Sequence, residues 1–142
     1  MKVLTIEQMN KLKELGVDTS IASMAIYDIY AGENKVYYII ASNGAFPEEQ
    51  EYDRFGYGIY SAVAFCKKPV FTLQDIIELL PPQLMHEEEN IYFSFESIGK
   101  EYGFYYVTVD FEIRIYFNNT NILQSAYSML LWVIENGYLK TK

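Results

Sequence analysis

The stretch "TNILQSAYSMLLWVIENGYL", residues 120–139, decides the fold expected for this chain. Asn121 is a favourable helix cap with Gln124 three positions later, and Gly137 is placed to end the helix. Between these limits the helix is apolar over most of its circumference, at Leu123, Ala126, Tyr127, Leu130, Val133 and Ile134. Because such a helix is normally buried between other elements, we expect it to be the main pillar of the core.

Two shorter helices are predicted from the same capping chemistry. Thr5 and Thr72 each stand three positions before a residue that can bond back to their backbone, which is the spacing of a capping box. The patterns that follow predict helices over residues 6–15 and 73–80, each with one apolar stripe. The proline pair at 81–82 then forbids continuation of the second helix, because proline offers no backbone donor.

The strands are expected in two regions of the chain. "SMAIYDIY" and "KVYYIIAS" flank the turn-type tetrapeptide "AGEN" and predict a hairpin over residues 23–42, followed by a strand near 59–65. "NIYFSFESIG" and "GFYYVTVDFEIRIYFNN" alternate strongly and predict two or three antiparallel strands with a tight turn near 110–112. The alternation predicts two shared faces, one of Ile91, Phe93 and Phe95, the other of Val107, Val109, Phe111, Ile113, Ile115 and Phe117.

The order helix, strands, helix, strands, helix defines the expected fold class. With short links between strands, it favours an α+β domain in which about three helices pack on one face of a mostly antiparallel sheet, in two layers. A length of 142 residues suits one such domain over residues 1–142.

Composition excludes several classes of function. A formal net charge of −8 disfavours direct binding to nucleic acid or to an anionic membrane surface. No stretch reaches the length of a membrane span and the N-terminus lacks the apolar core of a signal peptide, so we expect a cytoplasmic protein. With Cys66 as the sole cysteine, neither an intramolecular disulfide nor a cysteine zinc cluster can form.

No catalytic, cofactor-binding or metal-binding residue is assigned from the sequence. His86 is the only histidine and is expected in a surface loop, whereas Cys66 is expected as a buried structural thiol. The "HEEE" run at 86–89 indicates solvated loop charge, because adjacent residues on a loop do not converge on one ion. "GYG" at 56–58 lacks the lysine and the strand-to-helix setting of a phosphate loop. A protein without enzymatic activity and without cofactors is the preferred interpretation.

Tyrosine is the unusual feature of the composition, with fourteen residues. Tyr92, Tyr106 and Tyr116 are expected opposite the core face of the second group of strands. Exposed tyrosine supplies large, stiff contact area of the kind found in protein interfaces. These rings therefore either form a partner-binding surface or cover the outer face of the sheet beneath further loops.

Three stretches resemble a family of small uncharacterised proteins from bacteriophages and mobile elements of gut Bacteroides-group bacteria. They are "LTIEQMNKLKELGVDTSIASM", "FTLQDIIELLPP" and "SMLLWVIENGYL", together about a third of the chain. The family pattern reads T-x-E-Q-M and L-G-V-D-T at the start, T-L-Q-D-I-L-E-L-L-P in the middle and C/W-V-I-E-N-G-Y at the end. The acidic, irregular stretch at 43–58, which is expected to be a loop, departs from that pattern. The resemblance implies a mobile-element accessory protein and carries no catalytic residues.

Three functions are compatible with these features. The first is a non-enzymatic module that binds an unidentified protein or a second copy of itself. The second is a small enzyme or ligand-binding protein that uses Cys66, His86 or a pair of carboxylates. The third is an acidic mimic of DNA that inhibits a nucleic-acid enzyme of the host. The aromatic surplus places the first hypothesis ahead of the other two.

Overall fold

The computed structural model describes residues 2–31, 34–45 and 63–139. Three α-helices are present in this part: α1 (Ile6–Glu14), α2 (Leu73–Leu79) and α3 (Ile122–Glu135). A short 3-10 turn, η1, covers Thr19–Ile21. The strands are β1 (Met24–Ala31), β2 (Asn34–Ser42), β3 (Val63–Val70), β4 (Gln83–His86), β5 (Glu89–Ile98), β6 (Glu101–Val107) and β7 (Ile113–Asn119).

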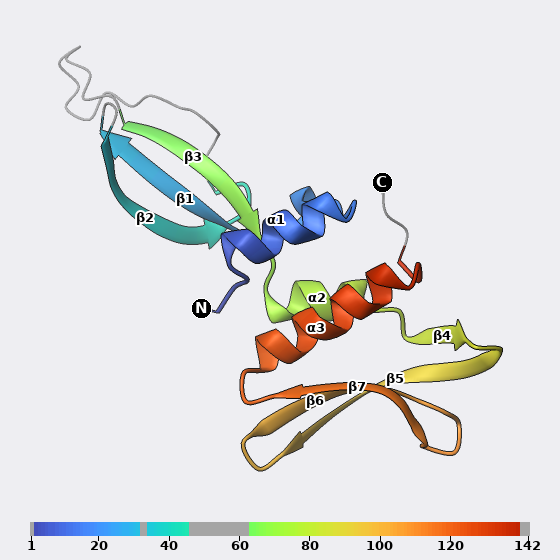
Figure 1. Cartoon of the computed structure of the whole chain (residues 1–142). Helices are drawn as coiled ribbons and strands as arrows, with labels where there is room; N and C mark the ends of the chain where they lie inside the picture. The colour runs from blue at the N-terminus through green and yellow to red at the C-terminus, as the bar shows by residue number, and fades with distance from the viewer. Residues whose placement is uncertain (1, 32–33, 46–62, 140–142) are drawn as a thin grey trace.

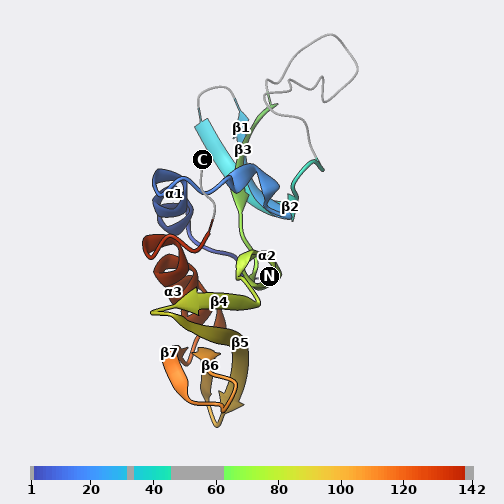
Figure 2. The same cartoon turned by 90° about the vertical axis from the view of Figure 1, so that its right-hand side faces the viewer.

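The strands form two separate antiparallel sheets. The first sheet has the order β2-β1-β3, and the second sheet is a meander in the order β4-β5-β6-β7. The three helices lie between the two sheets, as both views show (Figure 1, Figure 2). The α+β class and the antiparallel pairing predicted from the sequence are confirmed, and the division of the strands between two sheets is added by the structure.

Helix α3 is the centre of the core, as its apolar circumference predicts. It packs on β6 and β7 of the second sheet and on α2. Its buried residues are Leu123, Ser125, Ala126, Met129, Leu130, Val133 and Ile134. Ser125 is polar, but its hydroxyl donates a 2.8 Å hydrogen bond to the carbonyl of Tyr102, so its burial leaves no polar atom unpaired.

The start of the chain is fixed by backbone and side-chain bonds to distant segments. The amide of Leu4 donates to the carbonyl of Phe71 at 2.9 Å, and both side chains are buried in the core. Gln8 of α1 donates from its side-chain amide to that of Gln124 on α3 at 2.9 Å. These bonds join α1 to α3 and to the connection that leads from β3 into α2.

Asp75 ties helix α2 to the first sheet. Its carboxylate completes the capping box by accepting the amide of Thr72 at 2.9 Å, while the hydroxyl of Thr72 accepts the amide of Asp75. The same oxygen, Oδ2, accepts both the amide and the hydroxyl of Ser23, at 3.1 and 2.9 Å, at the entrance to β1. The predicted capping boxes of α1 and α2 are both confirmed. The bonds between Asp75 and Ser23 are tertiary contacts that the capping pattern does not predict.

Most of the strand predictions hold, but two of them fall partly outside the described residues and one strand was missed. The predicted hairpin over 23–42 and the turn near 110–112 are confirmed. The strand expected near 59–65 begins at Val63 in the described residues and extends to Val70, while residues 59–62 lie outside them. Strand β4 was not predicted, because four residues are too few to show an alternation. Most of the predicted loop over 43–58 also lies outside the described residues.

The buried face predicted along residues 107–117 is wrong in part. Val109, Phe111 and Ile113 are exposed, whereas Phe104 and Tyr106 are fully buried. The reason is that the turn between β6 and β7 and the register shift beside it reset the alternation, so even positions face the core on β6 and odd positions on β7. Within the described residues, no helix has the length and apolar character needed to cross a membrane.

Replacement of Asp75 by alanine is expected to lower the free energy of unfolding by about 2–3 kcal/mol, because it removes a helix cap and two bonds to Ser23 together. Urea denaturation measures the change. Glu78→Ala on the same helix is the matched control and is expected to change stability by less than about 0.5 kcal/mol, since Glu78 is exposed. Equal effects of the two substitutions would contradict a tertiary role for Asp75.

Candidate functional site

The outer face of the second sheet, opposite α3, carries a group of aromatic side chains. The strand register pairs Tyr105 with Tyr116 and Tyr92 with Val107, which places these four side chains on one face. The rings of Tyr105 and Tyr116 are stacked, with centroids 6.0 Å apart and planes 20° from parallel. Val107 is buried, so we define this surface by its three rings, Tyr92, Tyr105 and Tyr116, and call it the tyrosine face.

The rings of the tyrosine face are accessible to solvent and uncharged, with Glu96 and Arg114 at neighbouring positions on the same side of the sheet. Tyr92 and Tyr116 keep 37% and 57% of their surface in contact with solvent, and Ser94 stands opposite Tyr105 in the register. The ring of Tyr105 lies over Gly103, where a Cβ atom would collide with it. The ring therefore protects a stretch of backbone that has no side chain of its own. Uncharged aromatic surface of this kind matches the central part of protein interfaces, where charged residues are depleted.

The prediction that Tyr106 lies on the exposed face is wrong. Tyr106 is fully buried on the core face of β6, where it stands opposite Phe93 and packs against Trp132. Its hydroxyl donates a 2.8 Å hydrogen bond to the carbonyl of Pro81, and burial raises the pKa of its phenol above the usual value. The sequence "FYYV" contains two adjacent tyrosines, and the register of β6 decides that Tyr105 is the one that faces outward.

Tyr106→Phe is expected to lower the free energy of unfolding by about 1–2 kcal/mol, because it removes the partner of the Pro81 carbonyl in a buried position. Tyr116→Phe on the tyrosine face is the control and is expected to be close to neutral, since that residue is 57% exposed. Thermal and urea denaturation measure both variants. A neutral Tyr106→Phe would mean that this hydrogen bond does not stabilise the fold.

Cys66 and His86 do not form a catalytic pair in this structure. Cys66 is on β3 in the first sheet and His86 on β4 in the second sheet, with the helices between the sheets (Figure 1). Cys66 is exposed, so the expectation of a buried thiol is wrong. The apolar residues that precede it in the strand led to that expectation, but β3 presents this position to solvent.

His86 has a packing role instead of the predicted surface-loop position. Its ring meets Trp132 and Tyr138 edge to face, with centroids 5.2 and 5.7 Å away, and its Nδ1 atom shares a hydrogen bond with the Tyr138 hydroxyl. The side chain is 19% exposed. Among the described residues, no three histidine, cysteine or acidic side chains converge as metal ligands, which leaves the "HEEE" run without a scaffold for an ion.

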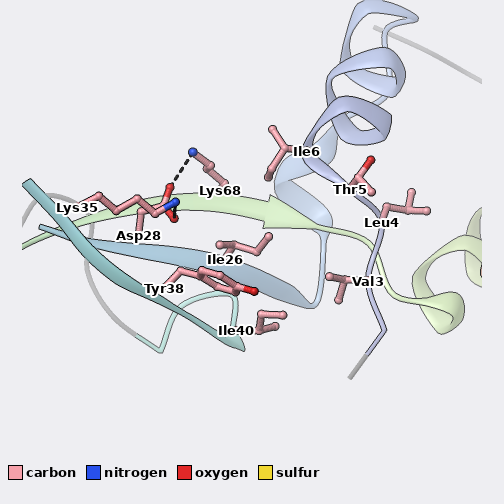
Figure 3. A pocket seen from close by; sticks show the side chains of 10 residues that line it. All are labelled: Val3, Leu4, Thr5, Ile6, Ile26, Asp28, Lys35, Tyr38, Ile40 and Lys68. Atoms are coloured by element: carbon pink, nitrogen blue, oxygen red, sulfur yellow. Dashed lines mark ion pairs between the residues drawn. The ribbon is translucent and has the colours of Figure 1, made fainter.

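A pocket on the first sheet contains the most unusual charge arrangement of the described residues (Figure 3). Asp28, in the middle of the central strand β1, is buried, and its two carboxylate oxygens lie 3.0 Å from Lys35 Nζ and 2.7 Å from Lys68 Nζ. The cavity has a volume of about 320 Å³. Its apolar walls come from β1, β2 and the N-terminal segment, and the residues that line it are Val3, Leu4, Thr5, Ile6, Ile26, Asp28, Lys35, Tyr38, Ile40 and Lys68. We call it the lysine-rimmed pocket.

The charges of the lysine-rimmed pocket are unequally exposed. Burial by itself raises the pKa of the Asp28 carboxyl, but the hydrogen bonds and positive charges of Lys68 and Lys35 outweigh it and lower the pKa below its usual value. The two lysine side chains keep 48% and 42% of their surface in solvent. Two ammonium groups therefore hold one buried carboxylate at the rim of the pocket. The sequence does contain a signal for this site: Asp28 stands inside the predicted strand "AIYDIY", and strand interiors are depleted in aspartate.

Asp28→Asn is expected to lower the free energy of unfolding by about 1–3 kcal/mol at pH 7, a moderate loss because water can solvate the half-exposed lysines. A lowered pKa in the folded state gives stability that is fully present above the unfolded pKa of about 3.9 and is lost as the pH falls through the folded value. The difference between wild type and variant should thus be constant from about pH 7 to 5 and shrink on further acidification. Urea denaturation across this pH range tests the expectation, and a difference that grows in acid would contradict it.

Comparison with models of known protein families, with characterised proteins and with solved structures gives no match.

Proposed function

We propose that this protein is a non-enzymatic interaction module that binds a protein partner through the tyrosine face. The observation that carries the proposal is the uncharged group of Tyr92, Tyr105 and Tyr116 on an open antiparallel sheet, in which Tyr105 stacks on Tyr116, and Tyr92 and Tyr116 are exposed. Tyrosine loses little conformational entropy on binding because it has only two side-chain torsions, and its hydroxyl can bond at the rim of a contact. The resemblance to mobile-element proteins supports an accessory role in such an element, with a host protein as the partner.

The strand framework supports a binding role in physical terms. Strands β5, β6 and β7 hold the three rings through backbone pairing, and α3 packs against the other side of the sheet. A surface fixed in this way loses little conformational entropy when a partner binds. An interaction module of this kind needs no catalytic group.

The second candidate is a ligand-binding protein, and the lysine-rimmed pocket is the observation that favours it. The pocket combines a concave apolar wall with a few polar groups, which is the general character of small-ligand sites. Its volume of about 320 Å³ lies at the lower end of the range for such sites. An acidic mimic of DNA stays the third proposal, and it predicts binding that weakens steeply with salt.

The test of the main proposal is affinity capture with a triple variant, Tyr92→Ser, Tyr105→Ser and Tyr116→Ser. Tagged wild type is exposed to a lysate of a Bacteroides-group host, and bound proteins are eluted by a salt gradient and identified by mass spectrometry. A partner that binds the wild type is expected to lose at least about tenfold in affinity with the variant, since aromatic residues dominate interface energetics.

The matched control for this experiment is Ile21→Ser, which removes an apolar side chain of similar exposure (55%) from η1, far from the tyrosine face. Circular dichroism tests whether both variants fold as the wild type does. The proposal fails if the triple variant captures the same partner as tightly as the wild type does. Loss of binding by the control alone would move the interface to the region of η1.

A further inference from the structure

A hollow at one end of the second sheet joins the tyrosine face to a group of acidic side chains. The turn between β4 and β5 and the turn between β6 and β7 form its walls, and its volume is about 430 Å³. Tyr92 lines the hollow together with four carboxylates, those of Glu88, Glu89, Asp110 and Glu112. We call it the acidic hollow. An aromatic ring of the tyrosine face and a cluster of negative charge therefore border the same concave surface.

The negative charge of the acidic hollow is only partly balanced. Arg114 donates from Nε to Glu89 at 2.7 Å and from a terminal nitrogen to Glu112 at 2.9 Å, so one guanidinium stands against four carboxylates. The carboxylates of Glu88 and Asp110 form no hydrogen bond or ion pair with the part of the chain that the structure describes. Both are free to pair with a cation from another molecule.

The turn that carries Asp110 and Glu112 is closed by hydrogen bonds. The amide of Phe111 donates to the carbonyl of Thr108, and the amide of Thr108 donates to the carbonyl of Glu112, both at 2.9 Å. The hydroxyl of Thr108 also accepts the amide of Glu112 at 3.1 Å. The backbone that positions these two carboxylates is therefore fixed before any partner binds, which lowers the entropic cost of binding.

Negative charge also stands at the far end of the tyrosine face. Glu96 is on the same side of β5 as Tyr92 and four residues farther along, a distance of about 13 Å on an extended strand. Tyr105 lies between these two positions in the register, because it pairs with Ser94, and Tyr116 stacks on it. The rings are therefore flanked by carboxylates at both ends.

Tyrosine rings flanked by carboxylates suit a cationic side chain, and arginine suits them better than lysine. The guanidinium group is planar, stacks on an aromatic ring and donates paired hydrogen bonds to a carboxylate. Lysine carries the same charge but offers neither the planar stacking nor the paired donors. The formal net charge of −8 of the whole chain also attracts a basic partner over longer distances.

We infer that the tyrosine face and the acidic hollow together bind an extended, arginine-containing basic segment of a partner protein. Side chains on one side of an extended segment recur about every 7 Å, so alternate residues can reach the acidic hollow, the rings and Glu96 in turn. The inference rests on the proposed function, because it names the chemistry of the partner that the tyrosine face binds.

The test uses a synthetic peptide of about seven residues in which arginine alternates with glycine. The full chain is labelled with ¹⁵N, and amide chemical shifts are followed by NMR as the peptide is added. The wild type is expected to bind with a Kd on the order of 0.1–1 mM at low salt, with the largest shifts at Tyr92, Tyr105, Tyr116 and the acidic hollow. A peptide with lysine in place of arginine is expected to bind at least about threefold more weakly.

A double variant, Glu88→Gln with Asp110→Asn, removes the two unpaired charges and leaves the three rings in place. It breaks no side-chain contact of the described residues, so it is expected to fold as the wild type does. It is expected to bind the arginine peptide about five- to tenfold more weakly. The matched control, Glu7→Gln with Glu14→Gln, removes the same charge from exposed positions of α1, away from the second sheet (Figure 1), and is expected to change binding less than about twofold.

Three results would overturn the inference. The first is an arginine peptide that causes no shifts at these residues up to about 5 mM. The second is a Glu88→Gln/Asp110→Asn variant that binds the peptide as tightly as the wild type. The third is a lysine peptide that binds as tightly as the arginine peptide, which would reduce the interaction to attraction between net charges and leave the rings without a role.

The lysate capture separates failure of this inference from failure of the proposed function. If the triple serine variant loses the partner and Glu88→Gln/Asp110→Asn keeps it at full affinity, the tyrosine face binds a partner that is not basic. The proposed function then stands and this inference fails. If the triple serine variant keeps the partner, the proposed function itself fails.

Discussion

The need to bury helix α3 on nearly all sides is the constraint on which the rest of the structure depends. An amphipathic helix needs one covering layer, but α3 is apolar over most of its circumference and needs several. The second sheet covers one side, α2 covers another, and Gln8 of α1 bonds to Gln124 near its start. The helices therefore occupy the middle of the molecule, and each sheet keeps a face that no helix covers (Figure 1).

This arrangement explains why the candidate surfaces are where they are. A four-stranded sheet with one face on a helix layer must turn its other face outward, and the tyrosines occupy that face. The three-stranded first sheet has a charged residue, Asp28, at its centre, where an apolar residue would ordinarily pack. Burial of that carboxylate is tolerated because Lys35 and Lys68 pair with its two oxygens at the edge of a concave surface.

Left-handed backbone conformations at residues other than glycine are concentrated in the turns at one end of the second sheet. The described non-glycine residues with positive φ are Glu87, Glu88 and Phe111, and all three belong to the two turns at that end. Turns that serve only to connect strands favour glycine or asparagine at such positions. The side chains at these three positions are therefore held at a conformational cost that glycine would avoid.

The sequence by itself determined the helices, their caps, the main hairpin and the α+β class, because capping and apolar periodicity act over only a few residues. The tertiary structure decided which side of each strand faces the core. The turn after β6 and the register shift beside it reversed the alternation, so Tyr106 is buried and Tyr105 takes its place outside. It also brought Asp28, Lys35 and Lys68 together from three strands of one sheet. Such contacts depend on strand pairing between distant residues, and no local pattern of the sequence encodes that register.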